Sequence, residues 1–382
     1  MNKQFNTSAV FVAACAGMGF FGVTMLSLGP LLGRIGELGV NANALPSTLT
    51  IGIIIGTVLF GPIVDKFGYK GLTILSSIFA LAGMLGLNFF ATDLLLQGSI
   101  CILGIGGGVL NGLTNALVSD IYEDDKRGGR LSLLGAFYCI GALLWTLLNY
   151  FIEDYHIPLY AMSAVMACFI IYFFFIGFPK AKPAGSVGFG QTVGLLRFPA
   201  LLMFGLVLFF QSGLEGSSGD FTVSFLTKTG RMDTAAATLA MTWFTIGMMI
   251  GRLILGSVTK ILKDLGTLYC YLTVALAGVA IIAFCPTAVG AYVAMALLGF
   301  GVGATFPVIL GYVGGAFRNQ SGTAISIAVF IALLGQFTLK KVTGAAFDQG
   351  AFLTLPLVLS GAIVVMMFLI PLAIKLGKNT KQ

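Results

Sequence analysis

Two acidic residues lie inside a long apolar stretch of the chain. Glu215 and Asp220 belong to the sequence QSGLEGSSGD, between the apolar runs Phe198–Phe210 and Phe221–Leu226. A carboxylate in an apolar environment has a raised pKa, so it can exchange a proton or hold a cation near working pH. The glycines of this decapeptide predict a weakened or broken helix. A structural acid paired across helices is the alternative for Glu215, and a solvated helix end is the alternative for Asp220.

Further polar side chains lie in neighbouring apolar runs. Asn111 and Asn115 are four residues apart, so they share one face of a helix. Amides offer donors and an acceptor to the hydroxyl groups of a sugar, but they also hydrogen-bond between helices in membranes. Both interpretations stay open. The other candidates for substrate contact are Tyr138, Asn149, Gln211, Trp243, Gln336 and Lys340.

Two of these candidates allow a more specific interpretation. The ring of Trp243 can stack on the apolar face of a sugar, or it can simply pack in the protein core. Lys340 shares a helix face with Gln336 and is followed by Lys341. The lysine pair can extend to the membrane interface, reach one of the two intramembrane acids, or bind an anionic substrate.

The composition identifies the elements that position these side chains. The chain has 382 residues, of which 58% are hydrophobic and only 9% are charged. This excludes an ordinary soluble domain and a disordered chain. Apolar runs of ~20 residues recur along the whole length, and each can cross a bilayer as a helix. The fold class expected is therefore an all-α polytopic membrane protein, in which the first run is a span and not a cleaved signal peptide.

The distribution of charged and sulfur-containing residues also fits a helical membrane protein. Sixteen of the 21 lysines and arginines fall on one side of the predicted spans, which places both termini in the cytoplasm by the positive-inside rule. The net charge of +7 is thus a topology signal and indicates no nucleic-acid partner. The six cysteines have no paired spacing, so neither disulfides nor a metal site is expected. The predicted spans are 8–30, 45–64, 71–91, 94–118, 130–152, 157–178, 198–220, 235–257, 266–285, 288–313, 321–345 and 351–375.

An internal repeat divides the chain into two halves. The sequence IGIIIGTVLFG at Ile51–Gly61 matches IGMMIGRLILG at Ile246–Gly256, and LGIGGG at Leu103–Gly108 matches LGFGVG at Leu298–Gly303. Both matches have an offset of 195 residues. We therefore expect six-helix bundles over residues 1–178 and 198–382, joined by a cytoplasmic linker at 179–197. A substrate site is expected between the halves, near the bilayer midplane.

The loop after the second predicted span carries a recognisable motif. Gly61–Gly71 reads GPIVDKFGYKG, and its spacing resembles the Gly-x-x-x-Asp-x-x-Gly-x-basic motif of the major facilitator superfamily. The resemblance implies twelve helices in two pseudo-symmetric bundles and a cytoplasmic gate at this loop. Arg127 and Arg130 are candidate partners for the aspartate. The gating residues implied are Gly61, Asp65, Lys66, Gly68, Lys70, Arg127, Arg130, Gly251 and Arg252.

Four further stretches resemble the fucose permease branch of sugar:cation symporters within that superfamily. They are, in order, GIGGGVLNGLTN, FFQSGLEGSSGDFTVSFL, TWFTIGMMIGRLILG and GFGVGATFP. The chain departs from this branch at three places. Gly17–Pro30 has no acid, Asn111 stands where the branch has a glutamate, and Asp220 stands where it often has an aromatic residue. Glu215 is left as the main coupling candidate, with Asp220 second.

The resemblance predicts a secondary active transporter and not an enzyme. It implies uptake of a monosaccharide or related small polar solute with H⁺ or Na⁺, by alternating access, through a protein of the bacterial cytoplasmic (inner) membrane. The partners expected are the solute, the cation and the lipid bilayer, with a monomeric chain and no cofactor or metal. A drug or metabolite exporter of the same fold and a facilitative sugar uniporter are the alternatives.

Overall fold

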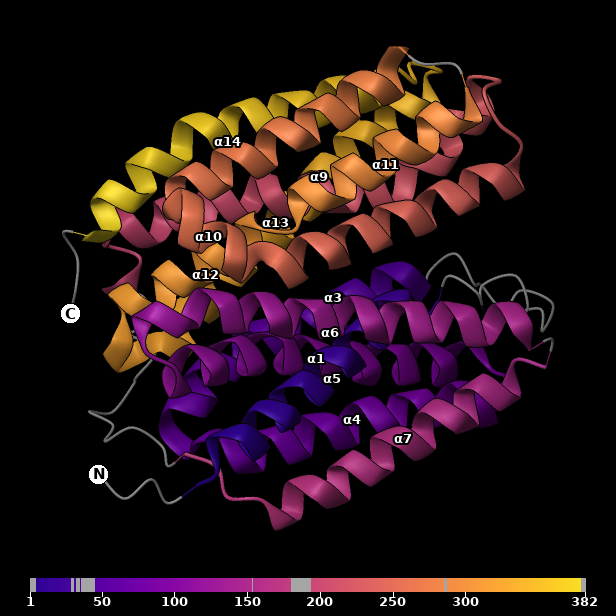
Figure 1. Ribbon diagram of the computed structural model, residues 1–382. Coiled ribbons are helices and arrows are strands. Elements are labelled where there is room, and N and C mark those ends of the chain that lie inside the picture. Colours follow the sequence, from indigo (N-terminus) through magenta and orange to yellow (C-terminus); the bar gives the residue numbers. More distant parts are fainter. Residues whose placement is uncertain are drawn as a thin grey trace. The chain divides into compact units, whose positions relative to one another are not determined.

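The chain folds into long helices. The computed structural model describes residues 5–28, 31, 35, 45–152, 154–179, 194–284 and 287–378, and it contains no strand within these ranges. Figure 1 shows the helices coloured along the chain. The helices of the first half are α1 (Thr7–Leu26), α3 (Leu45–Phe67), α4 (Tyr69–Phe89), α5 (Asp93–Ile121), α6 (Asp124–Phe151) and α7 (His156–Phe175). Those of the second half are α9 (Pro199–Lys228), α10 (Thr234–Phe284), α11 (Ala288–Val302), α12 (Thr305–Ala316), α13 (Ser321–Asp348) and α14 (Thr354–Lys378).

The helices account for all twelve predicted spans. Within the described residues, ten helical segments are long and apolar enough to cross a membrane, and α3 contains a shorter apolar segment, Thr48–Gly61. The helix α10 covers two spans, because Lys263 interrupts it with a φ of 58°. One span is formed by α11 and α12 together. The predicted all-α architecture is thus confirmed.

The chain divides into two compact units that do not follow the halves of the sequence strictly. Unit 1 comprises Met1–Glu123, Phe137–Val193 and Arg318–Ser326. Unit 2 comprises Asp124–Ala136, Gly194–Phe317 and Ile327–Gln382. The first turns of α6 therefore belong with helices of the second half, and the first turns of α13 belong with helices of the first half. We call these two stretches, Asp124–Ala136 of α6 and Ser321–Ser326 of α13, the exchanged segments.

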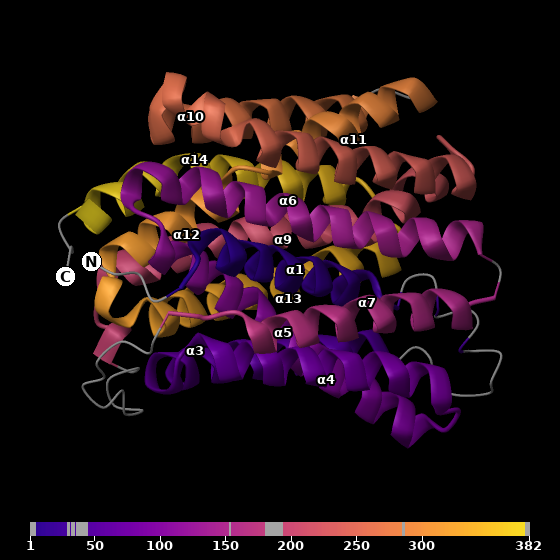
Figure 2. The ribbon, with the colours of Figure 1, turned by 60° about the horizontal axis from the view of Figure 1, so that its bottom comes forward.

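Within unit 1, α5 packs against α1, α3 and α4, and α7 packs against α4. Two views of the ribbon show α3, α4 and α5 running side by side (Figures 1 and 2). Glycines make this contact close. A methyl group added at Gly104 would lie 2.5 Å from the carbonyl oxygen of Leu49, and one at Gly56 would collide with the carbonyl of Ile105. The backbones of α3 and α5 can approach this closely only because neither glycine has a side chain.

Within unit 2, the first span of α10 and the helix α11 repeat the same packing. A methyl group at Gly251 would lie 2.6 Å from the carbonyl oxygen of Phe300, and one at Gly299 would collide with the carbonyl of Phe244. These contacts lie 195 residues after their counterparts in unit 1. The helix α9 packs against α14, and α10 also packs against α14 (Figure 2). The repeat seen in the sequence is therefore a repeat of helix packing.

The expected break in the helix at Gln211–Asp220 is wrong. The helix α9 runs without interruption from Pro199 to Lys228. Two of its glycines, Gly213 and Gly216, instead face α13, since a methyl group at Gly213 would lie 2.6 Å from the side chain of Leu339 and one at Gly216 would lie 2.6 Å from that of Gln336. Glycine here permits close helix packing and does not interrupt the helix. The interruption lies in the tenth span, between Val302 and Thr305.

Candidate functional site

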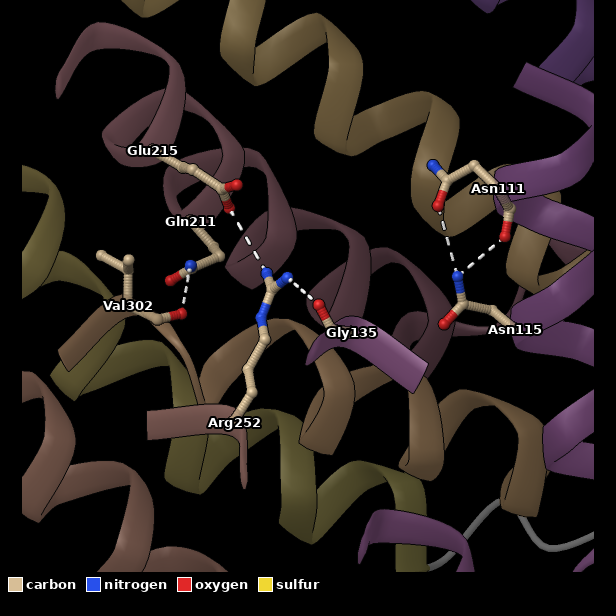
Figure 3. Close-up of polar contacts among 7 residues, drawn as sticks. All are labelled: Asn111, Asn115, Gly135, Gln211, Glu215, Arg252 and Val302. Atoms are coloured by element: carbon tan, nitrogen blue, oxygen red, sulfur yellow. Dashed lines mark hydrogen bonds and ion pairs between the residues drawn. The ribbon is translucent and has the colours of Figure 1, made fainter. Parts of the chain in front are cut away.

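A cluster of charged side chains lies in unit 2 (Figure 3). The guanidinium Nη2 of Arg252 lies 4.0 Å from Oε2 of Glu215, and Nη1 of Arg252 donates to the carbonyl oxygen of Gly135 at 2.8 Å. The side chain of Arg252 is only 6% exposed, and that of Glu215 is 24% exposed. The arginine therefore joins α9 to the first turns of α6. Such a charge at membrane depth is costly unless it is paired, and it commonly marks a functional site.

The backbone of α10 holds Arg252 in place. The residue before it, Gly251, accepts a hydrogen bond from the hydroxyl of Tyr271 at 2.8 Å through its carbonyl. The hydroxyl of Ser132 on α6 donates to the carbonyl of Arg252 itself. A methyl group at Gly135 would lie 3.0 Å from Cδ and 3.2 Å from Nε of Arg252. Glycine at position 135 thus leaves the volume that the arginine side chain occupies.

Gln211 has a structural role in this cluster. Its Nε2 donates to the carbonyl oxygen of Val302 at 2.9 Å, and the side chain is fully buried (Figure 3). This carbonyl is at the end of α11, where the helix interruption leaves it without an intrahelical donor. The Oε1 atom of Gln211 and the Oγ1 atom of Thr305 are both buried without a hydrogen-bond partner. These acceptors remain available for water or for a bound group.

Asp220 and Lys340 form a second ion pair in unit 2. Their Oδ2 and Nζ atoms are 2.7 Å apart, and the side chains are 54% and 29% exposed respectively. Of the alternatives left open for Lys340, pairing with an intramembrane acid is the one that the structure shows. Gln336 lies beside it, since a methyl group at Gly216 would lie 2.6 Å from both Cγ of Gln336 and Cε of Lys340.

The amide pair lies in unit 1. Nδ2 of Asn115 donates to the main-chain oxygen of Asn111 at 2.8 Å and to its Oδ1 at 3.3 Å (Figure 3). The two side chains are 3% and 6% exposed. The pair shares one face of α5, as the spacing predicted. It contains no charged group, in contrast to the cluster around Arg252.

Three other candidates have different surroundings. Asn149 donates to the carbonyl of Trp145 at 2.9 Å, and its Oδ1 is buried without a partner, as is Nε1 of Trp145. The ring of Tyr138 lies against Phe21, with centroids 5.6 Å apart. Trp243 is 42% exposed, so it is not an ordinary core residue.

The loop motif is described in part. The backbone of Asp65 and Lys66 belongs to α3, but their side chains lie outside the described residues, so the proposed pairing of Asp65 with Arg127 or Arg130 stays a prediction. Gly68 adopts a φ of 82°, a conformation that favours glycine. Lys70 donates to the carbonyl of Phe174 at 2.9 Å.

Another motif glycine, Gly61, contacts the exchanged segment of α13. A methyl group there would lie 2.7 Å from Cβ of Ser326 and 2.9 Å from Cα of Thr323. The hydroxyl of Ser326 also donates to the carbonyl of Thr57. Arg127 is 6% exposed, whereas Arg130 is partly exposed.

Sequence reasoning missed several polar residues. Asp120 accepts hydrogen bonds from the hydroxyls of Tyr69 and Ser321, and Tyr312 donates to Asp264 at 2.7 Å. A signal was present, because Tyr69 and Asp264 are separated by the repeat offset of 195. Among the described residues there is no group of acids, histidines and cysteines that could hold a metal ion.

The chain matches the model of the Major Facilitator Superfamily over residues 7–339. The chain belongs to this superfamily. The family explains the twelve helices and the two-fold repeat, and it makes the protein a membrane transporter of small solutes and not an enzyme. The expected resemblance is therefore confirmed.

Three relatives show how far the likeness extends. A TsgA homologue of Buchnera aphidicola is 22% identical over 382 residues, covering 95% of this chain and 94% of that protein. The human sodium-dependent glucose transporter 1 is 24% identical, covering 96% of this chain and 79% of its own. The crystal structure of the E. coli fucose:proton symporter FucP superposes with a TM-score of 0.79 at 18% identity, covering 95% and 98% of the two chains. At this identity the structural likeness shows the shared fold.

Proposed function

We propose that the protein transports a monosaccharide or a related small polar solute together with H⁺ or Na⁺, by alternating access. The observation that carries the proposal is the Glu215–Arg252–Gly135 cluster, in which a carboxylate in a membrane span is linked through one arginine to a second helix. The amide pair of α5 supplies neutral hydrogen-bonding groups suited to hydroxyls. Relatives named as glucose and fucose transporters support a sugar as the substrate.

The cluster suggests how an ion could be coupled to a helix movement. While Glu215 is charged, it attracts the guanidinium of Arg252 toward α9. Neutralisation of Glu215 by a proton or a bound cation removes this attraction, and Gly135 then remains as the acceptor for the arginine. The carbonyl of Gly135 lies in the segment of α6 that packs with the second half of the chain. The charge state of Glu215 is thereby transmitted to a helix from the first half.

The remaining features of the proposal follow the family and the sequence. Asn111, Asn115, Tyr138, Asn149, Trp243 and Gln336 are proposed to contact the solute. Asp220 with Lys340 forms a second charged pair that can respond to the cation or to an anionic substrate. The protein is proposed to act as a monomer in the inner membrane of a bacterium, with both termini in the cytoplasm.

A single substitution tests the coupling. We expect Glu215→Gln in proteoliposomes to lower gradient-driven sugar accumulation at least 10-fold, while exchange of labelled for unlabelled sugar continues. Glu123→Gln is the matched control, because Glu123 is an exposed residue at the start of α6. Unchanged accumulation by the Glu215→Gln variant would contradict the coupling role.

The substrate is tested separately by exchange with sugars, sugar acids and amino sugars. Each is measured with and without a pH gradient and a Na⁺ gradient, which identifies the cation. Exchange of a sugar without any response to either gradient would make the protein a facilitative uniporter. No exchange of any sugar would overturn the proposed substrate class, and the exporter alternative would then be favoured.

A further inference from the structure

An aspartate holds together three helices of unit 1. Oδ1 of Asp120 accepts a hydrogen bond from Ser321 at 2.7 Å, and Oδ2 accepts one from the hydroxyl of Tyr69. Ser321 is the first residue of α13, Asp120 is near the end of α5, and Tyr69 begins α4. The carboxylate therefore fastens the exchanged segment of α13 to two helices of the first half.

The position in unit 2 that corresponds to Asp120 carries no carboxylate. The glycine contacts relate α3, α4 and α5 to their counterparts by an offset of 195, and the Ser132 and Ser326 contacts relate α6 to α13 by 194. By these offsets, Asp120 corresponds to Gly315, Ser321 to Arg127, and Tyr69 to Asp264. A glycine thus stands where the bridging acid stands in unit 1, and an arginine replaces the serine that donates to it.

A cavity of about 230 Å³ occupies this place in unit 2. Gly315, Arg127 and Asp264 all line it, and so do Thr259, Tyr312 and Lys378. Arg127 is 6% exposed, so its charge belongs to the wall of the cavity and not to the outer surface. The lining thus contains two cations and one carboxylate, and Tyr312 already donates to that carboxylate at 2.7 Å.

We propose that this cavity binds the phosphate monoester of a small polyol, whose anionic group takes the place of the missing carboxylate. A phosphate monoester carries a charge of about −1.5 to −2 at neutral pH. The two cations Arg127 and Lys378 outnumber the one carboxylate, Asp264, so the lining has a net positive charge that attracts this group. A guanidinium has five N–H donors, so Arg127 can contact a protein group and a phosphate together. The hydroxyls of Thr259 and Tyr312 and the carboxylate of Asp264 can bind the hydroxyl groups of the polyol.

Such a ligand would regulate transport. It would fasten the first turn of α6, through Arg127, to α10, α12 and α14, as Asp120 fastens α13 in unit 1. This consequence rests on the proposed function, since it assumes that α6 must separate from these helices during transport. Phosphorylation of an imported polyol is the class of reaction that would generate the ligand. The bound phosphate monoester then slows further uptake.

Binding is measured without transport, so the two proposals can fail separately. The full-length protein in detergent is titrated with glucose 6-phosphate, and the thermal unfolding midpoint is recorded. We expect a saturable rise of roughly 2–5 °C. Inorganic phosphate at the same concentration should give a much smaller rise. No response to glucose 6-phosphate would overturn the proposal, and an equal response to inorganic phosphate would reduce the site to an adventitious ion only.

Three variants locate the response in the cavity. Arg127→Gln is expected to abolish the rise, while Gly315→Asp restores the carboxylate of unit 1, raises the midpoint of the unliganded protein and removes the response. Lys378→Gln should weaken the response, and its matched control is Lys375→Gln, because Lys375 is on the same helix but does not line the cavity. A response that survives Arg127→Gln would place the ligand elsewhere and contradict the proposal.

A last experiment distinguishes a soluble phosphate ligand from the phosphate group of a lipid. If phosphatidic acid raises the midpoint and glucose 6-phosphate does not, the soluble ligand is wrong. In proteoliposomes, glucose 6-phosphate enclosed on the side of Lys378 should lower sugar exchange at least 3-fold in the wild type and leave the Arg127→Gln variant unaffected. Binding without any effect on exchange would overturn the regulatory role.

Discussion

The two units share one helix scaffold but differ in the residues that it presents. In unit 1, Gly56 of α3 lies against Ile105 of α5, and in unit 2, Gly251 of α10 lies against Phe300 of α11. The exchanged segments repeat as well, because Ser326 donates to the carbonyl of Thr57 as Ser132 donates to that of Arg252. Backbone contacts are thus conserved between the units.

The side chains at these equivalent positions are not alike. Thr57 lies at the position of Arg252, and its hydroxyl makes a long hydrogen bond of 3.5 Å to Gly108 on the neighbouring helix. The arginine instead reaches Gly135 on α6 and Glu215 on α9. Its larger volume is matched at position 135, where the glycine corresponds to Val329 of the other copy. In unit 2, Arg252 and the glycine that makes room for it, Gly135, thus add a charged contact to a helix scaffold that is otherwise the same in both units.

This difference separates the packing contacts from the residues that are proposed to act in transport. The glycines and hydroxyls that occur in both units are explained by close helix packing alone. The residues that occur in one unit only, Arg252 with Glu215 and the pair Asn111 with Asn115, need another explanation. A transporter that binds a neutral solute and a cation would divide the two tasks in this way.

The largest expected effect tests whether the glycine scaffold is equivalent in the two units. We expect Gly104→Ala and Gly299→Ala to lower the free energy of unfolding by similar amounts, at least about 2 kcal/mol each, because a methyl group at either position meets a backbone carbonyl. Thermal unfolding in detergent and the yield of folded protein measure the loss. The control is Gly98→Ala on α5, where nothing lies within 4 Å and alanine favours the helix. A loss confined to one unit would break the comparison.

The same glycines show what the sequence could predict. Apolar runs of helical length predicted the twelve helices and the positions of Asn111, Asn115 and Glu215 within them, and two matches at one offset predicted the repeat. These features depend on local apolar periodicity and on the repeat itself. The glycines between Gln211 and Asp220 led to the wrong prediction of a broken helix. The sequence alone does not distinguish a glycine that permits close packing from a glycine that breaks a helix.

Partners across helices were harder to predict. The link from Arg252 to Gly135 joins residues 117 positions apart and uses a main-chain acceptor, which no residue type reveals. Asp120 was overlooked because it lies at a helix end, where an acid normally faces solvent. The pairing of Lys340 with Asp220 was one of three interpretations, and only the packing of α13 on α9 distinguished them.

An intermediate effect tests the volume match at the charged link. We expect Gly135→Ala to lower sugar uptake about 3- to 10-fold, because the added methyl group would lie 3.0 Å from Cδ and 3.4 Å from Cζ of Arg252 and would shift the guanidinium. The folded yield should stay near that of the wild type, since the side chain of Arg252 can move. Gly129→Ala on the same helix is the control, because its methyl group would lie 3.7 Å from Gly256, an ordinary contact. Equal uptake by both variants would show that the position of the guanidinium does not matter.

The smallest expected effect compares the two hydroxyl contacts of the exchanged segments. Ser132→Ala and Ser326→Ala each remove one buried hydrogen bond to a main-chain carbonyl, at Arg252 and at Thr57 respectively. We expect each to lower the free energy of unfolding by about 1 kcal/mol. The two sites share no partner, so the double variant should show the sum of the single losses to within about 0.5 kcal/mol. A larger discrepancy in thermal unfolding would mean that the two exchanged segments attach cooperatively. The two units would then be coupled energetically, in addition to being similar in structure.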